Sequence, residues 1–79
     1  MKKEYRRVEV TWVDSNCLHG WQEPEVKTEI AEVSSLGFLI SEEESKLTLA
    51  PSVSEYGLIF NPIAIPKGCI KSVKELRLR

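Results

Sequence analysis

The residues of this sequence that could perform covalent chemistry gather in one short stretch, which contains Asp14, Ser15 and His19. These residue types form the nucleophilic triads of hydrolases, in which histidine takes the serine proton and a carboxylate orients the histidine. A triad requires a geometry held by a rigid scaffold, which nearness in sequence does not supply. The stretch also lacks a nucleophile elbow, and Asp14, Ser15 and Asn16 suit a turn whose side chains cap their own backbone. We therefore predict that the protein is not an enzyme.

Cys17 and His19, with Cys69 as a remote third residue, are the best candidates for metal ligands. Structural zinc sites normally combine two closely spaced ligand pairs, and this sequence has one Cys-x-His pair only. Cys69 lies between Gly68 and Ile70 and is typical of a small core residue. The acidic run 42–44 could attract a cation, but it also has the composition of a solvated turn. We expect neither a metal nor a cofactor.

The length of 79 residues limits the chain to one domain, residues 1–79, and its 42% apolar content is that of a folded protein. The basic start resembles that of a signal peptide, but Glu9, Thr11 and Asp14 interrupt any apolar segment after it. No run is long and apolar enough to span a membrane. We expect a soluble cytoplasmic protein with two free thiols.

Residues 5–13 alternate between apolar and polar, with Val8, Val10 and Trp12 on one face, which predicts a half-buried strand. Residues 14–27 have the composition of turns and no periodicity, so they predict a long loop. Leu18 and Trp21 are the expected anchors of this loop, with Trp21 folded back over one end of the domain.

Residues 36–49 form the hairpin around which the remaining strands are arranged. The strand that enters it is predicted over residues 28–40, with Gly37 at a bulge or a close backbone approach. An acidic tip follows at 41–46, and Leu47 and Leu49 then point inward. Residues 50–52 end this strand, and 53–57 form a second connection.

The fourth strand is predicted over residues 58–65, and its apolar parity switches at Asn61-Pro62. Because proline cannot donate to a strand ladder, this position indicates a bulge or a sheet edge. A tight turn at 66–68 leads to a last strand that starts at Cys69. Five short strands without a helix predict an all-β fold, a small five-stranded SH3/Sm-like barrel with a long loop between its first two strands.

Two segments resemble the halves of an Sm-like domain. Residues 37–39, the charged tip and 47–49 resemble its first half, and residues 65–70 with Val73 resemble its second half, where one helical turn links the last two strands. The N-terminal helix of that family has no counterpart, nor do the aspartate and asparagine of its nucleotide pocket. This resemblance implies a topology.

A second resemblance covers nearly the whole chain. Residues 10–15, 20–21, 36–39, 47–52 and 65–70 together resemble small proteins encoded by bacteriophages and prophages. That resemblance implies a genomic setting and no particular biochemical activity.

The basic residues concentrate at both ends of the chain, and ten of the twelve acidic residues lie from 9 to 55. If the first and last strands are neighbours, the two basic ends merge into one patch. Such a patch either balances the acidic middle or contacts phosphates, with Tyr5, Trp21 or Tyr56 stacking on bases. The net charge of −1 and the pI near 5.8 speak against nucleic acid. Nucleic-acid binding in the Sm-like manner is therefore the alternative function.

Small barrels often work by offering a groove or an open strand edge to a peptide or to copies of themselves. The strand that carries Pro62 and the last strand are the candidate edges. We therefore predict a protein-interaction or self-assembly module with a protein partner or a homo-oligomer, and no membrane or small-molecule substrate. The possible interaction surface comprises Trp21, Tyr56, Arg6, Arg7, Lys71, Lys74 and Arg77.

Overall fold

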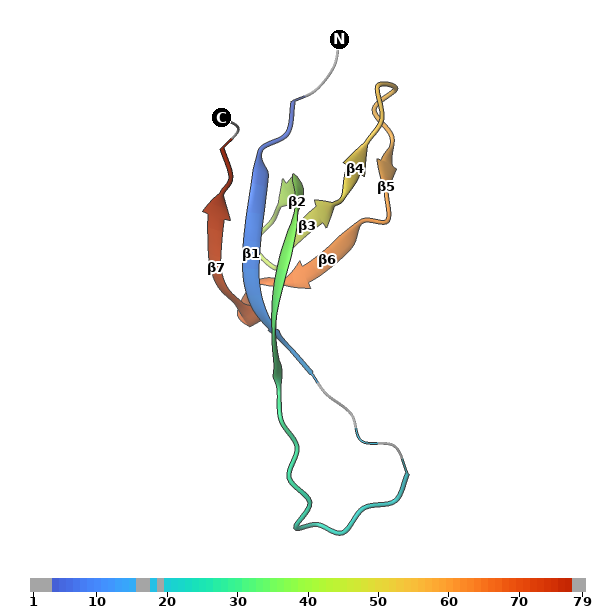
Figure 1. The fold of residues 1–79 in the computed structure, drawn as a ribbon, viewed down its shortest axis with the longest axis vertical. Coiled ribbons are helices and arrows are strands. Elements are labelled where there is room, and N and C mark those ends of the chain that lie inside the picture. Colours follow the sequence, from blue (N-terminus) through green and yellow to red (C-terminus); the bar gives the residue numbers. More distant parts are fainter. Residues whose placement is uncertain (1–3, 16–17, 19, 78–79) are drawn as a thin grey trace.

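The structure is a computed structural model that describes residues 4–15, 18 and 20–77. Figure 1 shows a chain of strands joined by turns. The elements are β1 (Arg7–Asp14), β2 (Ala31–Glu42), β3 (Lys46–Ala50), β4 (Ser52–Val53), β5 (Ile59–Phe60), β6 (Ile63–Pro66), the 3₁₀ turn η1 (Lys67–Cys69) and β7 (Ile70–Glu75). The predicted all-β class is confirmed. Within the described ranges there is no helix of the length and apolarity that a bilayer crossing requires.

Five strands form one antiparallel sheet in the order β6-β3-β2-β1-β7, and β4 and β5 form a separate two-stranded hairpin. The first and last long strands, β1 and β7, pair directly, as the merged basic patch requires. The ladder ends at β6 on one side and at β7 on the other. The two strands that the sequence indicated as edges are therefore the two edges of this sheet.

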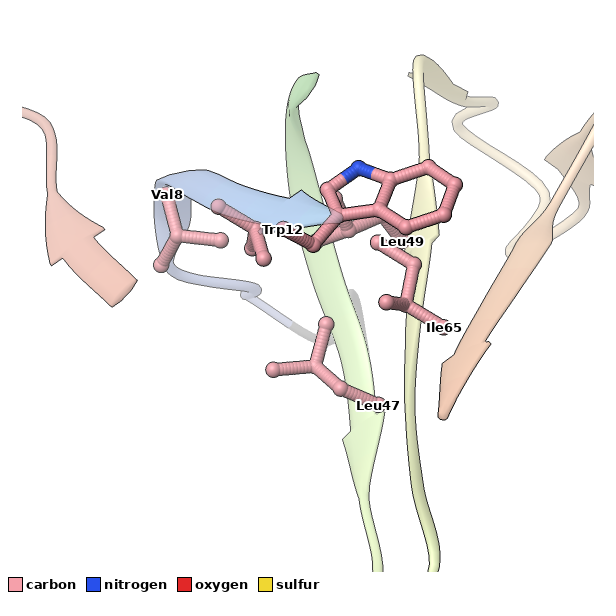
Figure 2. Close-up of a cluster of buried hydrophobic side chains, with 6 residues drawn as sticks. Val8, Trp12, Leu47, Leu49 and Ile65 are labelled. Carbon is pink, nitrogen blue, oxygen red and sulfur yellow. The ribbon is translucent and has the colours of Figure 1, made fainter. Parts of the chain in front are cut away.

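The core lies on one face of this sheet and is made by alternate residues. Val8 and Val10 of β1 are fully buried, as are Leu47 of β3 and Ile65 of β6, and Leu49 is nearly so. Figure 2 shows Val8, Leu47, Leu49 and Ile65 in one cluster with Trp12, whose indole lies above Leu49 and Ile65 in this view. The indole Nε1–H donates to Ser35 Oγ on β2 at 3.1 Å, which gives the polar atom of this large side chain a partner. The predicted period of two is confirmed over β1, which begins at Arg7, two residues after the predicted start at residue 5.

Strand β2 comes closest to β3 at Gly37. A Cβ at this position would lie 2.8 Å from the backbone oxygen of Ala50, a distance that real side chains do not tolerate. The predicted close backbone approach is confirmed, and the bulge on β2 lies slightly later, between Leu39 and Ser41. Strand β2 begins at Ala31, three residues after the predicted start, because Ala31 is opposite Asp14, the last residue of β1.

Two prolines interrupt the hairpin that runs from β3 to β6. Leu49 pairs with Ile63 on one side of the break and Ser52 pairs with Phe60 on the other. The residues between them include Pro51 on one strand and Pro62 on the other, and neither proline has an N–H to donate. The interruption predicted at Asn61-Pro62 is confirmed. It divides the single strand predicted over 58–65 into β5 and β6. The left-handed φ of 50° at Asn61 marks the bend.

The turn of the β4–β5 hairpin is held by Ser54. Its Oγ accepts the backbone N–H of Tyr56 at 3.2 Å and that of Leu58 at 3.1 Å. Gly57 donates its N–H to the backbone oxygen of Ser54 at 3.0 Å, and its φ of 85° favours glycine. The predicted connection over 53–57 is therefore a tight turn, with Val53 inside β4.

The connection between β1 and β2 projects away from the sheet, as Figure 1 shows, and the molecule measures 57 Å along its longest axis against 26 and 23 Å on the others. The prediction that Trp21 folds back over one end of the domain is wrong, because this side chain is fully exposed. Strand β1 ends at Asp14 and β2 begins directly opposite it at Ala31, so the connection lies beyond the end of the sheet. The second predicted anchor, Leu18, is also exposed.

Candidate interaction surface

Strand β7 gives the sheet an uncovered edge. It pairs with β1 on one side and is the last strand in the sheet order, and all of its residues except Ile70 are exposed. Val73 is 41% exposed although it lies opposite the fully buried Val10. This valine lies on the core face of the sheet, where no neighbouring strand covers its free side.

One hydrogen bond next to the end of β7 determines which of its residues direct their N–H and C=O groups toward β1. Leu76 donates its N–H to the backbone oxygen of Arg7 at 2.8 Å, so Leu76 faces β1. In an antiparallel ladder the backbone groups of successive residues point to alternate sides. Lys74, opposite Glu9, therefore also faces β1 through its backbone, and Val73 and Glu75 direct their N–H and C=O groups to the open side.

Strand β6, at the other edge of the sheet, offers few outward backbone donors. Lys67 donates its N–H to the backbone oxygen of Ser45 at 2.9 Å, so Lys67 and Ile65 face β3. The positions directed outward are then 62, 64 and 66, and two of these are prolines without an N–H. Ala64 alone offers a donor along this edge. Prolines on an edge strand oppose further strand pairing, so the two edges are unequal.

The pairing of β1 with β7 brings Arg6 and Arg7 to the same edge of the sheet as the lysines of β7, but acidic residues lie among them. Arg6 Nε is 3.4 Å from Glu75 Oε2, and Lys71 Nζ is 2.5 Å from Glu32 Oε2. Lys74 is opposite Glu9 in the ladder, and Arg77 is exposed just after β7. The pairs are solvent-exposed and contribute little stability. The basic ends form a mixed-charge surface.

Arg7 differs from the other basic residues because its guanidinium lies over the ring of Phe38, 5.3 Å from the ring centre. The two side chains line an open groove of about 270 Å³ together with Glu4, Tyr5, Glu55 and Gly57. The groove therefore carries both signs of charge beside two aromatic rings. Sequence reasoning identified Arg7 and Tyr5 but not Phe38 or Glu55, because only the register that places Arg7 opposite Phe38 brings them together.

The two exposed aromatic residues of the predicted surface lie far from each other. Tyr56 is 84% exposed in the turn of the β4–β5 hairpin, and Trp21 is fully exposed in the β1–β2 connection. Figure 1 shows these two segments at opposite ends of the molecule. Tyr56 shares its end with exposed Leu58 and Phe60, which alternate with Ile59 along the hairpin. Trp21 and Tyr56 are therefore exposed at opposite ends of the molecule.

The candidate catalytic and metal-binding residues gain no structural support. Asp14 Oδ1 accepts the backbone N–H of Ser15 at 2.8 Å, as expected for a turn that caps itself, and both residues are exposed. His19 and Cys17 lie outside the described residues, and Cys69 is a partly buried residue packed against the core. The described ranges contain no group of three side chains able to hold a metal ion.

No protein-family model, curated protein or solved structure matches this chain.

Proposed function

We propose that this protein is a non-enzymatic interaction module of the small SH3/Sm-like barrel kind, which binds by adding a strand to the open edge of β7. The observation that carries the proposal is the contrast between the two sheet edges. Val73 and Glu75 have outward backbone groups on an exposed strand, whereas prolines occupy the outward positions 62 and 66 on the other side. Backbone hydrogen bonds along a free edge are a common basis of peptide and subunit recognition.

The barrel class is supported by the strand order and by η1, the one 3₁₀ turn that links β6 to β7. A cytoplasmic role in a phage or prophage setting belongs to the same proposal and rests on the sequence alone.

A proline substitution tests the proposal at a single backbone group. Val73→Pro removes an outward N–H and leaves the ladder with β1 in place, whereas Ala64→Pro removes the corresponding group on the β6 edge. The readouts are light-scattering mass over a range of concentrations and selection of peptides from a random library. We expect the wild type and Ala64→Pro to assemble or to bind an extended peptide, and Val73→Pro to do neither while keeping its circular dichroism spectrum. A wild-type monomer that selects no peptide would contradict the proposal, as would equal losses in the two variants.

Nucleic-acid binding is the second candidate, and the adjacency of β1 and β7 favours it because Arg6 and Arg7 come close to the basic residues of β7. The interleaved Glu75 and Glu32 weaken it. An affinity for single-stranded oligonucleotides that falls steeply with salt, together with nucleic acid that copurifies at low salt only, would support this candidate. Arg7→Ala combined with Lys74→Ala would then make the affinity for the oligonucleotide depend less steeply on salt concentration.

A further inference from the structure

The charged side chains of β7 differ in whether the chain itself neutralises them. Glu75 has Arg6 as its partner, and Lys71 has Glu32. Lys74 is exposed, and its ammonium makes no ion pair or hydrogen bond with another residue that the structure describes. The open edge therefore carries one cation that a partner strand could neutralise.

The two faces of the sheet differ at this edge. Lys74 is opposite Glu9, whose carboxylate accepts the hydroxyl of Ser34 at 2.8 Å, so these side chains share the face away from the core. Val73 is opposite the buried Val10 on the core face and stays 41% exposed. A strand added to β7 thus meets a free cation on one face and an uncovered apolar side chain on the other.

We infer that the strand which adds to β7 is an extended segment of another protein, antiparallel to β7, with aspartate or glutamate directly before an apolar residue. The inference rests on the proposed function and adds the chemistry of the partner. In an antiparallel pair, the residue before the one opposite Val73 lies opposite Lys74. The strand pairings of the main sheet are antiparallel, and this arrangement is the more stable per residue.

The outward backbone groups of β7 place the charge pair where side chains come closest. Val73 directs its N–H and C=O outward, so it exchanges both hydrogen bonds with the apolar residue of the partner. Lys74 and the acidic residue then form a pair without mutual hydrogen bonds, in which side chains approach more closely. Opposite charges in directly paired positions stabilise a sheet, and like charges destabilise it.

The edge strands of a second copy do not provide this acid. Three two-fold registers match the outward residues Val73 and Glu75 with one another. In these registers Lys74 meets Ser72, Lys74 or Leu76 of the second copy. Strand β6 contains no acidic residue. Charge complementarity at Lys74 therefore favours a different protein as the occupant.

Peptide selection tests the inference. The probe is a library of random decapeptides, selected in parallel on the wild type and on Lys74→Glu. We expect the wild type to enrich aspartate or glutamate directly before an apolar residue, and Lys74→Glu to enrich lysine or arginine at that position. Selection of the same peptides by both proteins would overturn the inference, as would wild-type peptides without this acid.

Lys27→Glu is the matched control. It changes the net charge by the same amount in the β1–β2 connection, which projects away from the sheet. It should select the same peptides as the wild type. A shift in preference equal to that of Lys74→Glu would mean that net charge alone sets the selection, which would overturn the pairing with Lys74.

A charge exchange on one selected peptide measures the pair. Replacement of its acidic residue by lysine should weaken binding to the wild type about fivefold, and Lys74→Glu should recover that loss. If Val73→Pro abolishes binding but Lys74→Glu recovers nothing, the proposed function stands and only this inference fails. A wild type that selects no peptide but dimerises through Val73 would likewise assign the edge to a second copy. A monomer that selects no peptide would contradict the proposed function itself.

Discussion

The two tryptophans of this chain, nine positions apart, have opposite environments. Trp12 is 9% exposed over the core of the sheet and donates a hydrogen bond from its indole to Ser35. Trp21 is fully exposed in a connection that projects from the same sheet. The difference lies in the flanking residues, because Trp12 continues the alternation of Val8 and Val10 and Trp21 follows glycine in a segment without periodicity. A large apolar side chain is therefore informative about burial only within a repeating pattern.

Replacement of Trp12 should have the largest effect on stability. Trp12→Ala removes a buried indole from above Leu49 and Ile65 and leaves a cavity that a small core cannot refill, which should cost about 3–5 kcal/mol of unfolding free energy. Urea unfolding followed by far-ultraviolet circular dichroism measures this loss. Trp12→Phe is the matched control and should lose less, since it keeps most of the apolar volume. A loss below about 1 kcal/mol for Trp12→Ala would show that the indole is not part of the core.

Substitution of Gly37 should have the next largest effect, because a single methyl group there meets backbone. The new Cβ would lie 2.8 Å from the oxygen of Ala50, and neither strand can move without disturbing the ladder. We expect Gly37→Ala to destabilise the protein by about 1–3 kcal/mol, the usual cost of overpacking. Gly68→Ala is the control, since nothing lies within 4 Å of its Cβ. Equal midpoints of thermal unfolding for the two variants would contradict the close approach.

The sequence allowed the strands to be predicted wherever one local signal decided the outcome. Alternation defined β1, and Pro62 marked the interruption between β5 and β6. The register was not predictable, because it depends on pairings between residues far apart in the chain. The break in the β3–β6 hairpin lies between the Leu49–Ile63 and Ser52–Phe60 pairs, where each strand carries a proline, and each proline alone indicates only a strand end.

The candidate surface was predictable in part. The sequence indicated both edge strands, but it could not reveal that positions 62 and 66 point outward, since that depends on the hydrogen bond from Lys67 to Ser45. It grouped Trp21 with Tyr56 on exposure alone, whereas the two side chains belong to opposite ends of the molecule. The groove beside Phe38 was missed because its residues come from three separate segments.

Two adjacent serines of β2 provide a finer test of the environment around Trp12. Ser35 accepts the indole N–H of Trp12 on the core face, and Ser34 donates its hydroxyl to Glu9 Oε2 at 2.8 Å on the exposed face. Ser35→Ala leaves a partly buried donor without its partner and should cost about 1 kcal/mol. Ser34→Ala should change the unfolding free energy by less than about 0.5 kcal/mol. The reverse order in chemical denaturation would mean that the indole bond contributes nothing.

The smallest effect is expected at Trp21, where Trp21→Ala removes a side chain that is already in solvent. The unfolding free energy should change by less than about 0.5 kcal/mol, since the native state loses no packing. Fluorescence separates the two tryptophans. Acrylamide should quench most of the emission of Trp12→Phe, which retains Trp21, and little of the emission of Trp21→Ala, which retains Trp12. Poor quenching of Trp21 would show that it is covered in solution, and dilution would then distinguish burial within one chain from burial against a second copy.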